Sequence, residues 1–215
     1  VGLAPSNFDS SVADVNNSGS VDIVDALIIA QFYVGLISQL DCPASLTPAP
    51  TLAGPVSIAC GSSTAVGIFQ ADQYYSGGST YNNSNTIDVS LISDNPPPAG
   101  LFNNERFGEM SYSIPGFAAG GTYAVTLYFA ETYLTSSGGR LFNVSINGTG
   151  VLANFDIYAA AGGQNRAISR AFTTAADSIG QIAIQFTPVT ENPKINGIHI
   201  QSGTAPTPGP TLVPT

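Results

Sequence analysis

Residues 142–147 read Phe-Asn-Val-Ser-Ile-Asn, which is a strict alternation of apolar and polar side chains. Because successive side chains of a β-strand point to opposite faces, a period of two predicts a strand with one buried and one solvated face. Residues 123–129 and 182–187 alternate in the same way, and clusters of Gly, Asn, Ser and Pro separate such stretches. No long amphipathic helix is predicted between residues 56 and 202. The expected fold is therefore mainly β, an antiparallel β-sandwich of the jelly-roll type.

Two Pro/Thr-rich stretches, residues 47–55 and 207–215, flank the alternating block and are typical of extended linkers. A smaller unit precedes the first of them. Its first three residues, Val-Gly-Leu, recur at residues 34–36, which indicates that the chain begins at the last turn of an earlier repeat and is part of a longer protein. The predicted organisation is a half-repeat at residues 1–41, a linker at 42–55, the β-sandwich at 56–202 and a tail or linker at 203–215.

Acidic residues outnumber basic ones, since 14 Asp and Glu stand against 5 Lys and Arg, for a formal net charge of −9. Such a chain has no basic face that could neutralise several phosphates, so nucleic acid is excluded as a partner. The longest apolar run, residues 26–37, is shorter than the roughly 20 residues that a membrane-spanning helix needs. No membrane span is therefore predicted.

The two cysteines, Cys42 and Cys60, occur together with Thr/Pro tracts and several Asn-x-Ser/Thr sequons, a combination typical of secreted proteins. We therefore expect an extracellular protein in which Cys42 and Cys60 form a disulfide, with two free thiols as the alternative. Candidate N-glycosylation sites are Asn82, Asn143 and Asn147. The last two are expected on one outward face of the same strand.

Residues 14–25 carry oxygen-bearing side chains at the spacing of a calcium loop. Hard Ca²⁺ takes about six to eight oxygen ligands, and a glycine in the middle of the loop permits the sharp turn between them. Gly19 stands at that position, and Ser20 is expected to act through its carbonyl and Asp22 through water. The predicted calcium ligands are Asp14, Asn16, Ser18, Ser20, Asp22 and Asp25.

With the Ala/Leu/Ile-rich stretch that follows the loop, residues 14–36 resemble a dockerin repeat. The resemblance implies a small α-helical, EF-hand-like segment with Ca²⁺ as its cofactor. Dockerins have two such halves and dock on cohesin, whereas this chain has one half and a stub. The expected partner of this segment is a cohesin-like domain, a neighbouring copy of the chain, or an adjacent domain of the same protein.

Six further segments, in the same order along the chain, resemble malectin and malectin-like carbohydrate-binding modules over residues 57–200. The segments are residues 71–81, 104–108, 127–133, 142–149, 154–157 and 191–196. The resemblance implies a non-catalytic module that binds glucose-containing oligosaccharides or polysaccharides at one end of the sandwich. A sugar ring presents an apolar C–H face to aromatic side chains, and its hydroxyls need fixed carboxylate or amide partners.

Carried over residue by residue, the resemblance places the carbohydrate-binding positions at Tyr81, Phe107, Tyr133, Leu134 and Glu191. Three of them depart from the family pattern. Phe107 stands where tyrosine is usual, Leu134 where a second aromatic is usual, and Glu191 where aspartate is usual, so that binding is expected to be weaker or retuned. The alternative is that these aromatic side chains pack within the sandwich.

Two other functions remain open from the sequence. Glu105, Glu131 and Glu191 are carboxylates that a glycoside hydrolase could use, but the family resemblance favours a binding module over an enzyme. Arg106 is expected to pair with Glu131 or Glu105. The sequence as a whole predicts a secreted, non-catalytic carbohydrate-binding module with a calcium-binding repeat, and the alternative is a self-assembling subunit of an extracellular, glycosylated fibril.

Overall fold

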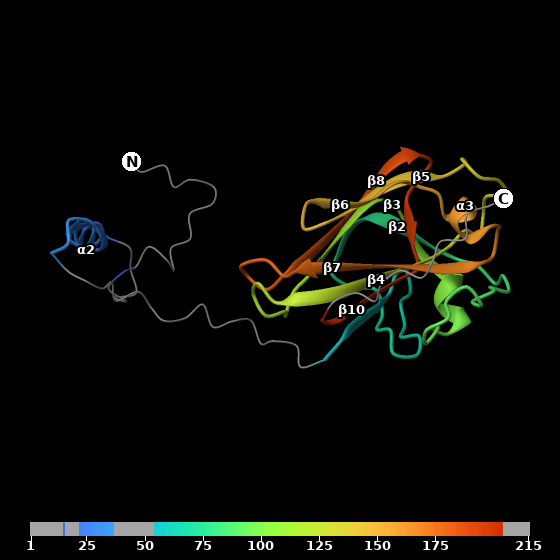
Figure 1. Cartoon of the computed structure of the whole chain (residues 1–215), viewed down its shortest axis with the longest axis horizontal. Coiled ribbons are helices and arrows are strands. Elements are labelled where there is room, and N and C mark those ends of the chain that lie inside the picture. The colour runs from blue at the N-terminus through green and yellow to red at the C-terminus, as the bar shows by residue number, and fades with distance from the viewer. Residues whose placement is uncertain (1–14, 16–21, 37–53, 204–215) are drawn as a thin grey trace. The chain divides into compact units, whose positions relative to one another are not determined.

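The computed structural model describes residues 15, 22–36 and 54–203. The chain divides into two compact units, Val1–Pro48 and Ala49–Thr215 (Figure 1). Within the described residues, no helix combines the length and the apolar character that crossing a membrane requires.

The first unit contains α2 (Ile23–Tyr33), which begins after Asp22. The Asp22 side chain accepts a hydrogen bond from a backbone N–H of the first turn at 2.7 Å, and Asp25 accepts the Asp22 N–H at 2.8 Å, which together form a capping box. The helix is followed by Gly35 at a φ of 76°, a left-handed conformation that glycine adopts without steric cost. The first unit thus contains a helix in the segment for which the resemblance implies one.

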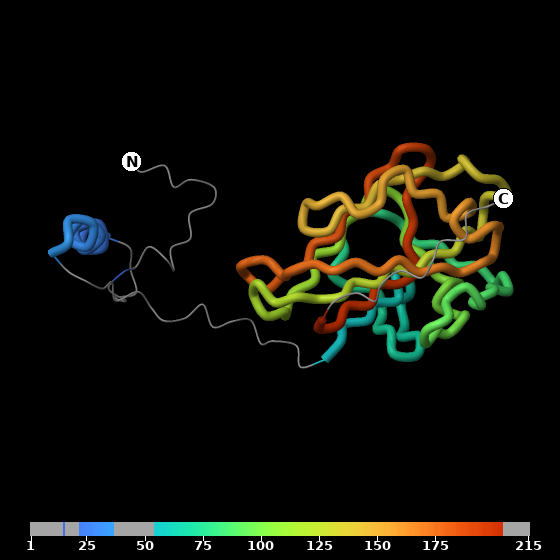
Figure 2. Tube along the Cα trace, viewed as in Figure 1, coloured from blue at the N-terminus to red at the C-terminus, as the bar shows by residue number. Residues whose placement is uncertain are grey.

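The second unit is a sandwich of two antiparallel sheets, as the alternating pattern predicts (Figure 2). The four-stranded sheet has the order β1-β10-β4-β7, with β1 (Val56–Ala59), β10 (Gly197–Ser202), β4 (Thr122–Ala130) and β7 (Ala167–Ala175). The other sheet has the order β2-β3-β8-β5-β6, with β9 paired to β3. Its strands are β2 (Tyr75–Asn82), β3 (Asn104–Ile114), β8 (Ile182–Thr190), β5 (Leu141–Ile146), β6 (Thr149–Phe155) and β9 (Lys194–Ile195).

The hydrophobic core lies between the sheets. In β5 the apolar residues Phe142, Val144 and Ile146 are at most 2% exposed, while the polar residues between them are half-buried. The inward residues of β3, β4 and β8 complete the core and include Tyr112, Phe129 and Phe186. The alternation read from the sequence therefore identifies the core face.

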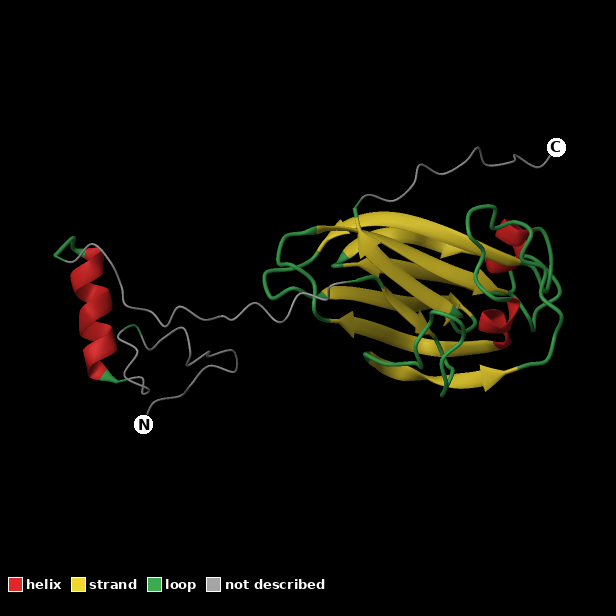
Figure 3. Ribbon diagram, turned by 90° about the horizontal axis from the view of Figure 1, so that it is seen from below, coloured by secondary structure: helices red, strands yellow, loops and turns green. Residues whose placement is uncertain are grey.

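β4 differs from the predicted half-solvated strand, because it is buried on both faces near its end. Leu127 and Phe129 face the core between the sheets, but Tyr128 and Ala130 on the opposite face are also buried. They pack in a second cluster with loop residues and residues of a short 3-10 helix, which include Phe69, Ile87, Ile92, Leu101 and Phe102. The helices η1 (Ala99–Asn103) and α3 (Ile157–Ala161) and long loops gather at this end of the unit (Figure 3). A layer of loops thus covers part of the four-stranded sheet.

The predicted disulfide is not found at Cys60, which is a free cysteine with 0% exposure. Cys60 follows β1 and packs into the core with Tyr112, so its thiol lies in the interior rather than beside the linker. Burial raises the pKa of this thiol well above its usual value, which makes it an unreactive thiol at neutral pH. Cys42 lies outside the described residues.

The candidate glycosylation sites also differ from expectation. Asn143 lies on β5, but Asn147 lies in the turn to β6 at a φ of 47°, so the two do not share a strand face. The Asn147 amide donates to the Ala175 carbonyl at 2.7 Å and accepts from the Ala183 N–H at 2.8 Å. The reason is local, since Asn-Gly is a strong hairpin-turn signal. Asn82 is exposed at the end of β2.

Candidate functional site

Two of the predicted site residues lie on neighbouring strands. Tyr81 on β2 stands opposite Glu105 on β3, and Phe107 on β3 stands opposite Lys194 on β9. Directly opposed residues and residues two apart share a face of a sheet, so these four side chains lie on one face. The two charged side chains are buried, whereas Tyr81 is 51% exposed and Phe107 is half-buried. Aromatic rings therefore lie above a buried charge pair.

The loop that follows β4 carries the next two predicted residues. Tyr133 is 72% exposed and Leu134 is half-buried. One carboxylate oxygen of Glu131 accepts the backbone N–H of Tyr133 at 3.0 Å and that of Leu134 at 3.1 Å. Since Glu131 itself is 0% exposed, a fixed carboxylate holds the backbone on which the exposed tyrosine stands.

Arg140 connects this loop to the turn between β8 and β9. Its Nε donates to the second oxygen of Glu131 at 2.7 Å, and its Nη1 donates to the carbonyl of Asn192. Burial alone would raise the pKa of Glu131. The hydrogen bond from Arg140 and the positive charges of Lys194 and Arg140 outweigh burial, and the pKa of Glu131 is lowered. The carboxylate is therefore ionised at neutral pH.

A second ion pair lies beside the first. Lys194, which is 0% exposed, donates to Glu105 and, at 3.1 Å, to the hydroxyl of Thr132. That hydroxyl in turn donates to Glu105 at 3.2 Å. Burial lowers the pKa of Lys194, and the nearby carboxylates of Glu105 and Glu131 oppose this effect. We call Glu105, Glu131, Arg140 and Lys194 the charged base of the site.

Two amide side chains and one backbone N–H hold the same loop from another side. The Thr132 carbonyl accepts from the Asn85 amide at 3.3 Å and from the Gln164 amide at 3.0 Å, and the Glu131 carbonyl accepts the Asn165 N–H at 2.8 Å. Segments far apart in the sequence thus converge on two residues of one loop. The backbone that leads to Tyr133 is fixed by charges, a hydroxyl and amides together.

The ion pair predicted for Arg106 is wrong. Arg106 pairs with Asp72 at 2.8 Å, and its guanidinium lies 3.3 Å from the centroid of the Tyr75 ring. Asp72 also accepts the hydroxyl of Tyr112 at 3.0 Å. Arg106 adjoins Glu105 in the sequence, but neighbouring residues of a strand point to opposite faces, so Arg106 cannot share the partner of its neighbour.

Glu191 lies in the turn between β8 and β9 at a φ of 59°, and its exposed carboxylate accepts a hydrogen bond from the Asn192 amide at 3.0 Å. Of the three glutamates that a glycoside hydrolase could use, Glu105 and Glu131 are neutralised in buried ion pairs. An exposed substrate therefore cannot reach two of the three carboxylates. This arrangement suits positioning rather than proton transfer.

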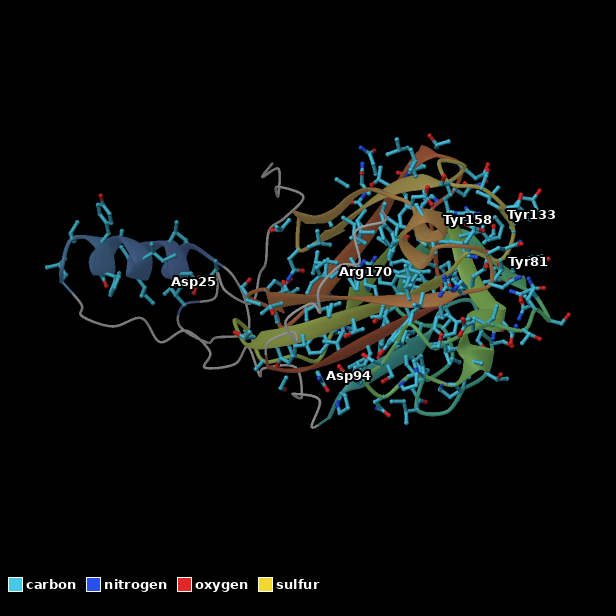
Figure 4. All side chains as sticks on the ribbon, turned by 45° about the vertical axis from the view of Figure 1, so that its right-hand side comes forward. Asp25, Tyr81, Asp94, Tyr133, Tyr158 and Arg170 are labelled. Carbon is cyan, nitrogen blue, oxygen red and sulfur yellow. The ribbon has the colours of Figure 1, made fainter. Side chains whose placement is uncertain are left out.

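The five predicted carbohydrate positions come from β2, β3, the loop after β4 and the turn before β9, and the charged base joins these segments. Figure 4 shows Tyr81 and Tyr133 at the same end of the sandwich. The sequence did not identify Arg140, Lys194, Asn85 or Gln164 as supports of the site. The only available signal was that a charged residue in so charge-poor a chain needs a partner.

Of the six predicted calcium ligands, Asp22 and Asp25 are described, and Asp14, Asn16, Ser18 and Ser20 lie outside the described residues. Asp25 is 1% exposed, and its two oxygens accept the N–H groups of Val15 at 2.9 Å and of Asp22 at 2.8 Å. The carboxylate thus joins both ends of the predicted loop. Within the described part of the chain, no group of three His, Cys, Asp or Glu is placed to hold a metal.

Comparison with known proteins identifies the family of the sandwich. The family model of the malectin domain matches residues 55–198, and the chain belongs to the malectin-domain family. Malectin-B of Xenopus laevis is 27% identical over 133 residues, which are 55% of this chain and 48% of that protein. The rice (Oryza sativa) kinesin-like protein KIN-14E is 31% identical over 142 residues, which are 62% of this chain and 13% of that protein.

The ANX2 ectodomain of Arabidopsis thaliana shares the fold, with a TM-score of 0.63 at 19% identity over 74% of this chain and 53% of that chain. This chain therefore spans about half or less of the proteins that it resembles. The predicted resemblance to malectin is confirmed for the sandwich. The dockerin-like resemblance of residues 14–36 lies outside the family match and stays a prediction.

Proposed function

We propose that the sandwich is a non-catalytic module that binds a neutral, glucose-containing saccharide at the end where Tyr81 and Tyr133 lie. The observation that carries the proposal is the 72% exposure of Tyr133 on a loop whose backbone is held by a buried glutamate. A tyrosine ring whose backbone is already fixed offers a preorganised apolar face, and the C–H face of a sugar ring can stack on it at a low entropic cost.

Each part of the site has a distinct role in this proposal. Tyr133 and Tyr81 stack on sugar rings, and Leu134 and Phe107 add apolar contact around them. Glu191 offers an exposed carboxylate for sugar hydroxyls, with its position fixed by the Asn192 amide. The charged base does not touch the saccharide, because its members are buried, and it determines where the rings stand.

The test is calorimetric titration of the full chain with maltotriose and with cellotriose. Tyr133→Ala is expected to weaken binding more than tenfold, because it removes a central aromatic contact. Tyr33→Ala is the matched control, since Tyr33 is 89% exposed and belongs to the other unit. Equal affinities of the two variants, or no heat with either sugar, would refute the proposal.

We further propose that the first unit binds Ca²⁺ through the loop that ends at Asp25. The buried Asp25 carboxylate that ties Val15 to Asp22 supports this proposal, because it draws the two ends of the loop together. Each of its oxygens has lone-pair capacity beyond the one N–H that it accepts. A calcium titration followed by helical circular dichroism tests it, and Asp14→Asn is expected to weaken binding because it removes an anionic ligand. Unchanged affinity in that variant would contradict the proposal.

The extracellular setting is part of the same proposal. Asn82 is exposed and stands in a sequon at the end of β2, where a glycan could be attached without disturbing the core. Peptide mapping of the protein from its native source tests this directly. A glycan on Asn82 would place the chain in a secretory route, whereas a complete set of unmodified sequon peptides would remove this support.

A further inference from the structure

A cavity lies on the outer side of the four-stranded sheet and shares no residue with the predicted carbohydrate positions. Its volume is about 250 Å³. Two strands form its floor, through Tyr128 of β4 and His199 of β10. Two loops form its walls, and the lining residues from them are Gly67, Ile68, Phe69, Asn95, Pro96, Pro97 and Pro98.

The walls of the cavity are held in place by their own contacts. The turn at Gly67 lies so close to the opposite wall that a Cβ there would come within 3.0 Å of Pro98. Phe69 is 2% exposed and packs edge-on to the Tyr128 ring, with 5.7 Å between their centroids and an interplanar angle of 84°. The cavity is therefore formed before any ligand arrives, as is usual for ligand sites.

The hydroxyl of Tyr128 is a polar group of the cavity lining that lacks a hydrogen-bond partner among the described residues. Tyr128 is only 9% exposed, and Phe102 packs against its ring at a centroid distance of 6.4 Å. In the described part of the chain, the side-chain nitrogen of Asn83 is the one polar side-chain atom that is both fully buried and unpartnered, so the Tyr128 hydroxyl must be accessible to solvent. A fixed phenol in the cavity lining is left to bond with whatever occupies the cavity.

The other polar groups of the lining are uncharged or paired. The Nδ1 of His199 lies 2.8 Å from the Ser57 hydroxyl, and its Nε2 lies 3.4 Å from the Gln201 side chain. Asn95 contributes an exposed amide. No Asp, Glu, Lys or Arg lines the cavity, which favours an uncharged occupant. Asp94 adjoins Asn95 and lies away from Tyr81 and Tyr133 (Figure 4), and its negative charge disfavours anions.

We propose that this cavity, which we call the outer pocket, is a second saccharide site that takes one ring of a neutral glycan. Aromatic and proline rings present apolar surfaces to the C–H face of a pyranose, and Tyr128 and Asn95 present hydrogen-bonding groups to its hydroxyls. The volume lies somewhat below the roughly 300 Å³ at which sites for drug-sized ligands begin, as expected for a single ring. The inference goes beyond the tyrosine site and does not depend on it.

The outer face of the sheet continues from the pocket with small side chains. The outward residues next to His199 and Tyr128 along the register are Ser57, Thr126 and Ser169. Ser57 is buried, whereas Thr126 and Ser169 are half-buried and have small side chains, so the face beside them leaves room for a further ring of a glycan. An oligosaccharide with one ring in the pocket is therefore the occupant that fits both the cavity and its surroundings.

The experiment is an NMR titration of the ¹⁵N-labelled full chain with maltotriose and cellotriose, which follows the amides of Ile68, Asn95 and His199. At least one sugar is expected to shift these signals in the native chain and also in Tyr133→Ala. Tyr128→Phe removes only an unpartnered hydroxyl, so the fold is expected to be kept. The affinity for the sugar, read from the signals of the pocket, is expected to fall about fivefold, which corresponds to the loss of one hydrogen bond. Tyr158→Phe, the same change on α3 outside the pocket, leaves it unchanged.

Three results would overturn the outer pocket. The first is no shift of its signals with either sugar, and the second is loss of those shifts in Tyr133→Ala. The third is a shift caused only by a proline-rich peptide such as Thr-Pro-Gly-Pro-Thr-Leu-Val-Pro-Thr, the sequence of residues 207–215, which would assign the pocket to a peptide. Shifts confined to the pocket would refute the tyrosine site and leave the outer pocket standing, so the two failures are distinguishable.

Discussion

The charged base and the tyrosines above it differ in charge and in exposure to solvent. Glu105, Glu131, Arg140 and Lys194 are all at most 5% exposed and paired with one another, whereas Tyr81 and Tyr133 are 51% and 72% exposed. The charged base is rigidly paired but is not accessible to a ligand. The tyrosines are accessible to a ligand but depend on other residues for their position. The difference separates the two tasks of a binding site, because one set of residues sets the shape and the other contacts the ligand.

This separation has an energetic consequence. Removing one member of a buried ion pair leaves the other charge unpaired in a medium that solvates it poorly, so the cost falls on folding. Truncating an exposed ring leaves nothing unpaired, so the cost falls on binding. Substitutions in the charged base should therefore lower stability, and substitutions of the exposed rings should change affinity.

The largest effect is expected for Glu131→Gln. The variant keeps the shape of the side chain but leaves Arg140 without a carboxylate, at 5% exposure. We expect the free energy of unfolding to fall by about 3 kcal/mol, measured by urea unfolding. A loss below about 1 kcal/mol would show that the charged base does not hold the site loop.

Acid should weaken the native protein through the same carboxylate. The folded-state pKa of Glu131 lies below its ordinary value of 4.5, so the stability it contributes is fully present above that value and is lost as the pH falls through the lowered pKa. Urea midpoints from pH about 6 to about 3 measure this loss. Glu131→Gln has no such carboxyl and should lose less stability over the same range, and identical profiles would contradict the assignment.

A smaller effect is expected for Phe107→Tyr, which adds a hydroxyl to a half-buried ring of the site. One additional hydrogen bond to a sugar corresponds to an affinity gain of about fivefold, measured by calorimetric titration. The free energy of unfolding should change by less than about 0.5 kcal/mol, as for surface substitutions in general. A large loss of stability would show that Phe107 supports the fold rather than contacts the sugar.

The smallest effect is expected for Asp88→Asn. The pair of Asp88 with Arg166 is 3.6 Å long and its side chains are 49% and 35% exposed, so water already screens both charges. We therefore expect no resolvable change of the midpoint in the urea assay. A loss as large as that of Glu131→Gln would mean that burial does not distinguish the charge pairs of this protein.

The sequence could predict the sandwich because alternation within a strand is a local property, and Phe142, Val144 and Ile146 face the core as expected. It could not predict the charge pairs, because strand order and register decide which partners meet. Glu131 and Arg140 are only 9 residues apart, but the partners of two other buried pairs are distant in the chain. Lys194 and Glu105 are 89 residues apart, and Arg106 and Asp72 are 34 apart. Pairing at such separations depends on strand order and register, which the local pattern does not specify.

Cys60 and β4 illustrate the same limit. The cysteine count indicated a disulfide, but the position of Cys60 at the end of β1 turns its thiol into the core. The alternation in β4 located the core face. Tyr128 on the other face is covered by a layer of loops, which sequence periodicity does not predict. The outer pocket arises from that layer, so it too could not be found from the sequence.

The most direct test of the division between base and tyrosines is to measure affinity for maltotriose and the free energy of unfolding on the same preparation of Tyr133→Ala. The predicted result is a more than tenfold weaker affinity with a free energy of unfolding within about 0.5 kcal/mol of the unaltered chain. Unchanged affinity, or a loss of affinity that is accompanied by a comparable loss of stability, would contradict it.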